Sequence, residues 1–229
     1  MIPRAFLGGF GQAKPMIDLH THTLLSDGAL IPSEHIRRFE VLGYSAVAIT
    51  DHADSSNLDH LVPRIVRVAE DLNQVQSVTV VPGVEITHVP PSLIGIQIKR
   101  ARELGARLVV VHGETVAEPV APGTNRAALD SGADILAHPG LIGREEVELA
   151  ARNGIFLEIS SRKGHSLTNG HVARLAGEVG ARLLVNSDGH GPADFMGEGF
   201  AQKVAAGAGL RAESVSEVFS NARFLLEKI

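Results

Sequence analysis

Short apolar runs alternate with longer amphipathic segments from residue 16 almost to the C-terminus. The apolar runs are continuous and rich in β-branched residues, which is typical of parallel strands covered on both faces. We predict seven such strands, at 16–20, 46–50, 79–85, 108–112, 135–138, 156–159 and 183–187. The segments between them predict helices with one apolar face, at 32–42, 61–75, 92–104, 125–131, 144–152 and 169–179.

The order of these elements favours a closed barrel. Seven strand–helix units in 229 residues fit a barrel better than an open doubly wound sheet, and the first strand lacks the glycine-rich phosphate loop of a dinucleotide fold. A final amphipathic stretch at 213–227 would cap the barrel. Glycines at the ends of five predicted helices indicate left-handed C-caps before the next strand: Gly43, Gly105, Gly132, Gly154 and Gly180.

Length and composition indicate one domain, at 16–229, preceded by a tail or plug at 1–15 that contains Phe6, Leu7 and Phe10. No apolar run is long enough to cross a bilayer, and the first residues lack the apolar stretch of a signal peptide. The chain has no cysteine, which excludes thiol nucleophiles and thiolate metal sites. We therefore expect a soluble cytoplasmic protein that has no membrane partner.

The charge distribution argues against a long nucleic acid as partner. The net charge is −5 with no basic block, and one tyrosine with no tryptophan leaves few aromatic side chains for stacking on bases. Short nucleotides stay open as ligands. Nothing in the sequence indicates an oligomeric state.

Six of the seven predicted strands deliver a histidine, aspartate or glutamate to the same end of the barrel, where barrel enzymes assemble their sites. One histidine at one strand end is more often an ordinary core or surface residue. His20 and His22, however, alternate along an extended segment and point the same way. Charged groups buried together without compensation are costly, and a metal ion removes that cost. We therefore predict a metal cluster.

The ordered motifs His-Thr-His, Thr-Asp-His, Pro-Gly-Val-Glu, His-Gly, Ala-His-Pro-Gly and Ser-Asp-Gly-His resemble those of the polymerase and histidinol phosphatase (PHP) family, over residues 17–190. The resemblance implies an α/β fold, a distorted (β/α)7 TIM-like barrel of parallel strands, with its active site at the C-terminal strand ends. It also implies a trinuclear metal centre. A Ser-Arg-Lys-Gly stretch is similar to the histidinol-phosphatase-like branch, a stand-alone metal-dependent phosphoesterase.

Carried over position by position, the resemblance implies nine metal ligands. They are His20, His22, Glu85 and Asp188 for one metal, Glu85, His112 and His138 for a second, and Asp27, His52 and His190 for a third. Imidazole and carboxylate ligands without sulfur suit zinc, manganese or iron, so we expect two to three divalent ions of these kinds.

Metal ions a few ångström apart lower the pKa of a bridging water and neutralise phosphoryl charge, so the hypothesis is hydrolysis by a metal-bridging hydroxide. Glu85, as the bridging carboxylate, and Asp188 are the expected catalytic carboxylates. Asp51 precedes His52 and is expected to orient a ligand imidazole. For Asp18, that role and satisfaction by backbone donors are both open.

Binding a phosphate requires cations besides the metals. The sixth predicted strand carries no assigned ligand and leads into Arg162 and Lys163, which are candidates for a phosphate clamp. Arg126 is a further candidate. The alternative for all three is a solvated surface position.

For protonation of the leaving alcohol, His165 is the first candidate general acid and Glu114 the second. His88 is expected in a loop without a role. Three further histidines are expected on helix surfaces: His35, His60 and His171.

The leading functional hypothesis is hydrolysis of a small phosphate monoester, with histidinol phosphate as the substrate that the resemblance suggests. The first alternative is a phosphodiesterase or exonuclease on nucleotides. An amidohydrolase would need a bridging lysine or another ligand order, and no lysine lies near the fourth predicted strand. A metal-binding regulatory module without catalysis is also possible in principle, but the complete ligand set argues against it.

Overall fold

The computed structural model describes residues 16–229, so the predicted tail at 1–15 lies outside the described residues. Its strands pair in parallel, in the order β1-β2-β4-β5-β6-β7-β8, while β3 pairs with β4. They are β1 (Met16–Asp18), β2 (Tyr44–Ile49), β3 (His52–Ala53), β4 (Thr79–Ile86), β5 (Leu108–His112), β6 (Ile135–Ala137), β7 (Phe156–Ser160) and β8 (Leu183–Asn186). An isolated bridge between Thr21 and Gly189 links the segments that follow β1 and β8. The nearly closed α/β barrel was predicted and is confirmed.

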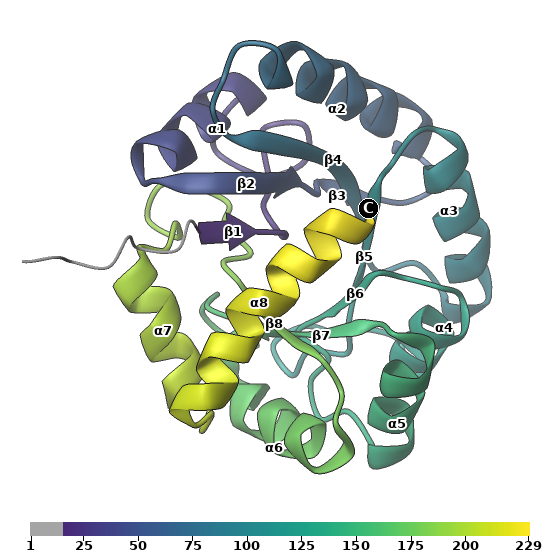
Figure 1. The fold of residues 1–229 in the computed structure, drawn as a ribbon. Helices are drawn as coiled ribbons and strands as arrows, with labels where there is room; N and C mark the ends of the chain where they lie inside the picture. The colour runs from purple at the N-terminus through teal and green to yellow at the C-terminus, as the bar shows by residue number, and fades with distance from the viewer. Residues whose placement is uncertain (1–15) are drawn as a thin grey trace, which may run out of the picture.

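Helices surround this barrel and cover one of its ends (Figure 1). They are α1 (Pro32–Val41), α2 (Leu58–Asn73), α3 (Pro91–Glu103), α4 (Thr124–Asp130), α5 (Arg144–Asn153), the 3-10 helix η1 (His165–Thr168), α6 (Asn169–Val179), α7 (Glu198–Gly207) and α8 (Ala212–Lys228). The five predicted C-cap glycines all have positive φ, between 68° and 106°.

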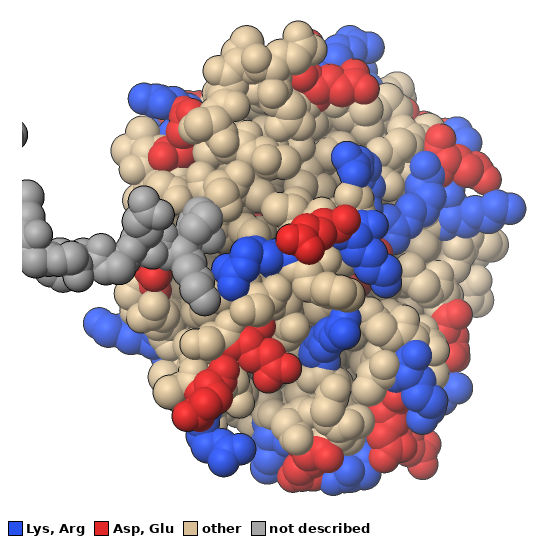
Figure 2. Space-filling model, viewed as in Figure 1, with Lys and Arg blue, Asp and Glu red and all other residues tan. Residues whose placement is uncertain are grey.

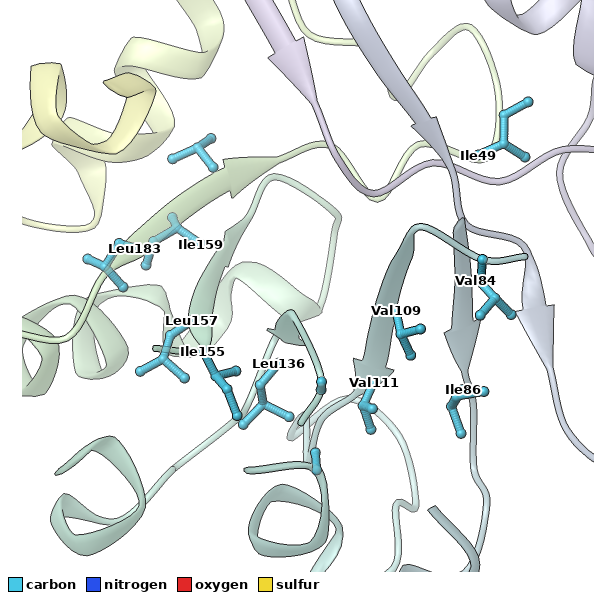
Figure 3. Packing of buried hydrophobic residues seen from close by; sticks show 14 of the residues in the cluster. Ile49, Val84, Ile86, Val109, Val111, Leu136, Ile155, Leu157, Ile159 and Leu183 are labelled. Carbon is cyan, nitrogen blue, oxygen red and sulfur yellow. The ribbon is translucent and has the colours of Figure 1, made fainter. Parts of the chain in front are cut away.

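Alternate residues along each strand face opposite sides of the sheet, so each apolar run supplies two cores. Val109 and Val111 of β5 pack toward the helices, together with Val84 and Leu136 from the adjoining strands (Figure 3). The interior of the barrel holds a second cluster that includes Leu108 and Val110 of the same strand. Burial on both faces explains why the strand sequences do not alternate between apolar and polar residues.

Helix α8 runs across one end of the barrel (Figure 1). Ala222 and Leu225 on its buried face join the interior cluster beside Ile17, Ala46 and Leu108. Leu108 begins β5 and Ile17 lies in β1, so α8 covers the N-terminal ends of the strands, as the amphipathic stretch at 213–227 predicted. The opposite end of the barrel is left for a functional site.

Three elements were not predicted: α7, β3 and the four-residue η1. Helix α7 buries only Ala201 and Ala205 among its side chains, so it lacks the strong apolar stripe by which helices are found. Strand β3 is two residues long, which is too short to show any period. No helix in the described part of the chain combines the length and apolar character needed to cross a membrane.

Candidate metal centre and active site

The C-terminal strand ends bring the predicted ligands to one place. In the sheet, His52 of β3 pairs with Glu85 of β4, and His112 of β5 pairs with Ala137, which precedes His138. A cavity of about 260 Å³ opens here. Its lining residues are Asp27, His52, Thr87, His88, His112, Glu118, His138, Arg162, His165, Asp188 and His190.

Glu85 lies at the centre of the cluster and is completely buried. Its Oε1 is 3.4 Å from Nε2 of His20 and 3.6 Å from Nε2 of His138, while its Oε2 is 2.7 Å from Nδ1 of His52. The two carboxylate oxygens thus face histidines from three different strand ends. This arrangement suits a carboxylate shared between two metal positions.

His22 and Asp188 join the centre to a more exposed group. Nε2 of His22 is 3.2 Å from Oδ1 of Asp188, and the His22 ring stacks on that of His190 with centroids 4.0 Å apart. His190 in turn places its Nε2 3.2 Å from Oδ1 of Asp27. Ligand atoms of His22, Asp27, His52 and His190 all lie within 4.8 Å of one another, a spacing that could hold one metal ion.

Several buried polar atoms in this centre lack hydrogen-bond partners within residues 16–229. They include Nε2 of His20, both ring nitrogens of His22 and Oε1 of Glu85. An unpaired buried polar atom costs about 1–3 kcal/mol, and coordination to a cation would satisfy these atoms together. The residues present therefore fit divalent metal ions, because imidazole nitrogens and carboxylate oxygens are ligands that such ions accept.

The charge states of the buried groups depend on one another. Burial lowers the pKa of His22 well below its ordinary value, and neighbouring His52 and His20 lower it further. Burial alone would lower the pKa of His20, but the carboxylates of Glu158 and Glu85 raise it well above its ordinary value. His22 is therefore neutral near pH 7, the state in which an imidazole binds a metal.

Two aspartates beside the ligands have structural partners. Asp51 accepts hydrogen bonds from the backbone N–H and hydroxyl of Thr23 and from the hydroxyl of Ser26, each at 2.7 Å. The prediction that Asp51 orients an imidazole was wrong; it holds the loop that carries Asp27. Asp18 accepts a hydrogen bond from the backbone N–H of Ser187 at 3.2 Å, as the backbone-donor alternative stated.

Glu158 was not predicted as a site residue. It is completely buried, and its Oε2 lies 2.7 Å from Nδ1 of His20 and accepts a hydrogen bond from the Asn186 side chain at 2.9 Å. The contact holds the Nδ1 proton and turns Nε2 of His20 toward Glu85. The signal was present in the sequence as one carboxylate inside the apolar strand β7.

The three predicted phosphate-binding cations end in different places. Arg162 lines the cavity, with Nη1 2.7 Å from Nδ1 of His190 and 3.1 Å from the Asp188 carbonyl oxygen. Lys163 is exposed and does not line the cavity. Arg126 is also outside it, on the exposed side of α4, where it pairs with Asp130 at 2.7 Å. The structure therefore does not bring Arg126 to the predicted site, and its phosphate role stays a prediction.

The candidate general acids also separate. His165 is buried at the cavity, its Nδ1 2.8 Å from Oγ1 of Thr115. Burial lowers its pKa to about 4, so His165 is neutral near pH 7. The general-acid role of His165 stays a prediction. Glu114 does not line the cavity. Its Oε1 accepts hydrogen bonds from the backbone N–H groups of Gly123 and Asn125 at the start of α4.

Among the histidines expected on helix surfaces, His35 was placed wrongly. It is completely buried, and its Nε2 lies 2.9 Å from Oγ1 of Thr21, between two predicted ligands. Its position on the buried face of α1, next to Ile36, was the signal that it faces inward. His60 is exposed, and His171 is half-buried with its Nε2 2.8 Å from the Ile142 carbonyl oxygen.

Two residues at the cavity come from loops and had no predicted role. Glu118 places its Oε2 3.1 Å from Nε2 of His112 and 3.0 Å from Nε2 of His88. His88, His138 and Asp188 are the non-glycine residues with positive φ in the described part of the chain, at 53°, 27° and 51°. Such conformations cost about 1–3 kcal/mol each and cluster at functional sites. His88 therefore shares the backbone signature of two predicted ligands.

Three relatives by sequence are informative. An uncharacterized protein of Methanocaldococcus jannaschii is 50% identical over 84% of this chain and 89% of its own. A protein of Shewanella loihica described as a probable phosphatase is 29% identical over 77% and 78%. The DNA polymerase/3'-5' exonuclease PolX of Bacillus subtilis is 26% identical over 79% of this chain, which spans only 35% of that protein.

Solved structures share the fold at low sequence identity. A proposed histidinol phosphatase from Listeria monocytogenes has a TM-score of 0.56 at 12% identity, covering 81% of this chain and 98% of that one. Ochratoxinase from A. niger has a TM-score of 0.62 at 13% identity, covering 92% and 71%. These likenesses support the barrel. The PHP domain matches residues 18–227, nearly all of the described chain, and the protein therefore belongs to the PHP family.

Proposed function

We propose that this PHP-family protein hydrolyses small phosphate monoesters with the help of two to three divalent metal ions. The observation that carries the proposal is the Glu85-centred cluster, in which buried imidazole and carboxylate atoms from separate strand ends lie within ligand spacing of one another. A phosphatase-named relative at 29% identity supports the phosphoester class. The cavity of about 260 Å³ suits a small ligand or the end of a larger one.

For the ligands, the proposal keeps the division that the resemblance implied. His20, His22, Glu85 and Asp188 would hold one ion, His112 and His138 a second beside Glu85, and Asp27, His52 and His190 a third. When bound, zinc, manganese or iron ions lower the pKa of a coordinated water and neutralise charge on the phosphoryl oxygens.

The chain's own side chains supply orientation and charge. Glu158 fixes the His20 ring through Nδ1, and Asp51 fixes the loop of Asp27. Arg162 is the arginine at the cavity, and its guanidinium can donate to phosphate oxygens in place of its present contact with His190. Lys163 follows directly and would add a weaker point charge at the mouth.

Histidinol phosphate is the proposed substrate. The family resemblance suggests it, and the fold shared with a proposed histidinol phosphatase is compatible with it. The first alternative is a phosphodiesterase or exonuclease on nucleotides, which the relative named as a polymerase and exonuclease favours. A regulatory module that binds metal without catalysis is the second alternative.

The test is phosphate release from L-histidinol phosphate by metal-loaded protein, beside other monoesters and a nucleotide diester with a coupling phosphatase. Chelated protein is the control. Chelator-sensitive turnover with kcat/KM above ~10⁴ M⁻¹s⁻¹ that favours histidinol phosphate would support both reaction and substrate. Cleavage of the diester without hydrolysis of any monoester would favour the phosphodiesterase or exonuclease alternative. No turnover of any ester by protein that holds its metals would favour the regulatory module.

A further inference from the structure

Three histidines meet on one side of the cavity, and a loop carboxylate faces them. His112 ends β5, His138 follows β6, and His165 begins η1. Their ligand nitrogens lie within 4.8 Å of one another, and the rings of His138 and His165 stack with centroids 4.1 Å apart. Glu118 lies in the loop between β5 and α4. Neither His165 nor Glu118 belongs to the nine ligands that the resemblance implied.

His165 and His112 each have an oxygen atom beside Nδ1. Nδ1 of His112 lies 3.1 Å from the Gly113 carbonyl oxygen, and Nδ1 of His165 lies 2.8 Å from Oγ1 of Thr115. The Gly113 carbonyl oxygen can only accept, so it keeps the proton on Nδ1 of His112 and leaves the lone pair of Nε2 free. The Thr115 hydroxyl can accept from Nδ1 of His165 in the same way, and the proposal takes this tautomer for His165. Nε2 of both rings is on the Glu118 side. Proteins orient imidazole ligands toward a metal in this way.

Glu118 approaches two of these histidines from the loop, one with each carboxylate oxygen. Its Oε2 is 3.1 Å from Nε2 of His112, and its Oε1 is 3.5 Å from Nε2 of His165. A carboxylate oxygen and an unprotonated imidazole nitrogen both carry lone pairs, so their close approach requires either a proton or a metal cation between them. Two ligand atoms that are each about 2.1 Å from one zinc ion are separated by about this distance.

His88 holds this carboxylate in place. Its Nε2 is 3.0 Å from Oε2 of Glu118, and its ring lies 4.8 Å from that of His112. The φ of 53° turns the His88 side chain into this contact. A strained backbone persists where its surroundings require it, which gives His88 a positioning function for Glu118.

We propose that Glu118 and His165 join His112 and His138 as protein ligands of one metal ion, with His88 positioning Glu118. The proposal rests on the proposed function and gives His165 a ligand role in place of the general-acid role. Together with the shared Glu85, these side chains would give the ion five protein ligands, and zinc sites without an open position retain their metal. This ion would then be the most tightly held, and an open coordination position for substrate would remain at the ion of Asp27, His52 and His190, which has three protein ligands.

The absence of cysteine from the chain allows a direct spectroscopic test. His165→Cys and Glu118→Cys would be loaded with Co²⁺, and near-ultraviolet thiolate-to-cobalt charge-transfer absorption would be recorded. We expect the absorption in both variants, because each new thiolate would replace a ligand. His60→Cys, at an exposed position on α2, is the control and should lack it. Folded variants that bind cobalt without this absorption would overturn the assignment.

Metal affinity gives a second readout. Competition with a chromophoric chelator for Zn²⁺ should show that His165→Asn and Glu118→Gln each weaken one bound equivalent by at least ~10-fold, while His60→Asn leaves all equivalents unchanged. Wild-type protein that binds no divalent ion would contradict the proposed function itself. Active wild type, beside variants with unchanged number and affinity of ions, would contradict only this assignment. So would a His165→Asn variant that keeps every ion but loses one limb of the pH–rate profile.

Discussion

The two ends of the barrel are built from the same strands and have opposite chemistry. At the N-terminal end, α8 closes the interior with Ala222 and Leu225, and acidic and basic side chains lie interspersed over the outer face of this end (Figure 2). At the C-terminal end, buried polar atoms lack partners among residues 16–229, and three non-glycine residues of this range have positive φ. One end therefore contributes stability, and the other carries a local energetic cost that bound metal would offset. Substitutions at the two ends should separate the two properties.

The largest effect is expected at the C-terminal end. Glu85→Gln removes the charge that faces His20 and His138. We expect kcat for phosphate release to fall by more than ~100-fold, above the ~10–100-fold typical of residues that only orient ligands. Metal content should fall with it. Glu103→Gln, an exposed carboxylate on α3, is the control. Full activity in Glu85→Gln would exclude Glu85 from the site.

At the N-terminal end, Leu225→Ala should lower the free energy of unfolding by about 2–5 kcal/mol, because it removes buried methyl groups and leaves a cavity under α8. Denaturant unfolding measures this effect, and Glu227→Ala on the outer side of α8 is its control. The kcat of the folded variant should match wild type. A large loss of kcat without a loss of stability would contradict the division between the ends.

The two arginines proposed for phosphate binding give a matched pair. Arg162→Ala should lower kcat/KM for a monoester by ~10–100-fold, which corresponds to the ~1.5–3 kcal/mol of a hydrogen bond to a charged group. Arg126→Ala should leave kcat/KM unchanged, because Arg126 is exposed and paired with Asp130. Steady-state kinetics on the same ester compares them. An unchanged Arg162→Ala would place the phosphate clamp elsewhere.

Glu158 offers a finer test of the metal centre. Glu158→Gln keeps the shape but removes the charge that holds the Nδ1 proton of His20. Metal affinity should weaken by ~10–100-fold, measured by chelator competition on protein whose circular dichroism matches wild type. Equal affinity in the two proteins would mean that the Glu158–His20 contact only supports packing.

The smallest expected effect concerns pH and His35. Burial lowers the pKa of His35 to about 4, below the ~6.5 of an exposed histidine. As the pH falls, His35 therefore gains its proton in the unfolded chain before it does so in the folded chain. The contribution of neutral His35 to the free energy of unfolding is fully present above pH 6.5 and is lost as the pH falls toward 4. His35→Gln in metal-free protein should reduce the loss of unfolding free energy between pH 7 and 5.5 by roughly 1 kcal/mol. His60→Gln, at an exposed position on α2, is the control.

The barrel was predictable from the apolar runs, and the resemblance to the PHP family implied the nine ligands, most of which lie at or just after a predicted strand end. In a parallel barrel, the C-terminal ends of all strands lie at the same end, whatever the conformation of the connecting loops. His112 and Asp188 could therefore be placed near each other without knowledge of the chain between them. The helix α7 escaped prediction because its buried side chains are alanines. Burial by small residues leaves a weak periodic signal.

Loop residues could not be placed in the same way. The chain between β5 and α4 turns Glu118 into the cavity and Glu114 toward the start of α4, and no periodicity distinguishes two glutamates four residues apart in a loop. His88 depends on a positive φ that favours glycine in most proteins. Glu158 was different: its strand position was visible, and only its partner, His20, required the fold.

The bridge between Thr21 and Gly189 gives the cluster a mechanical consequence. It marks a seam where the first strand meets the last, and the paired residues are about 170 positions apart in the chain. His20 and His22 stand on one side of the seam, and Asp188 and His190 on the other. Metal ions bound by residues from both sides would link the first strand to the last. Metal binding would then stabilise the closed barrel, and a higher concentration of free metal would favour it further.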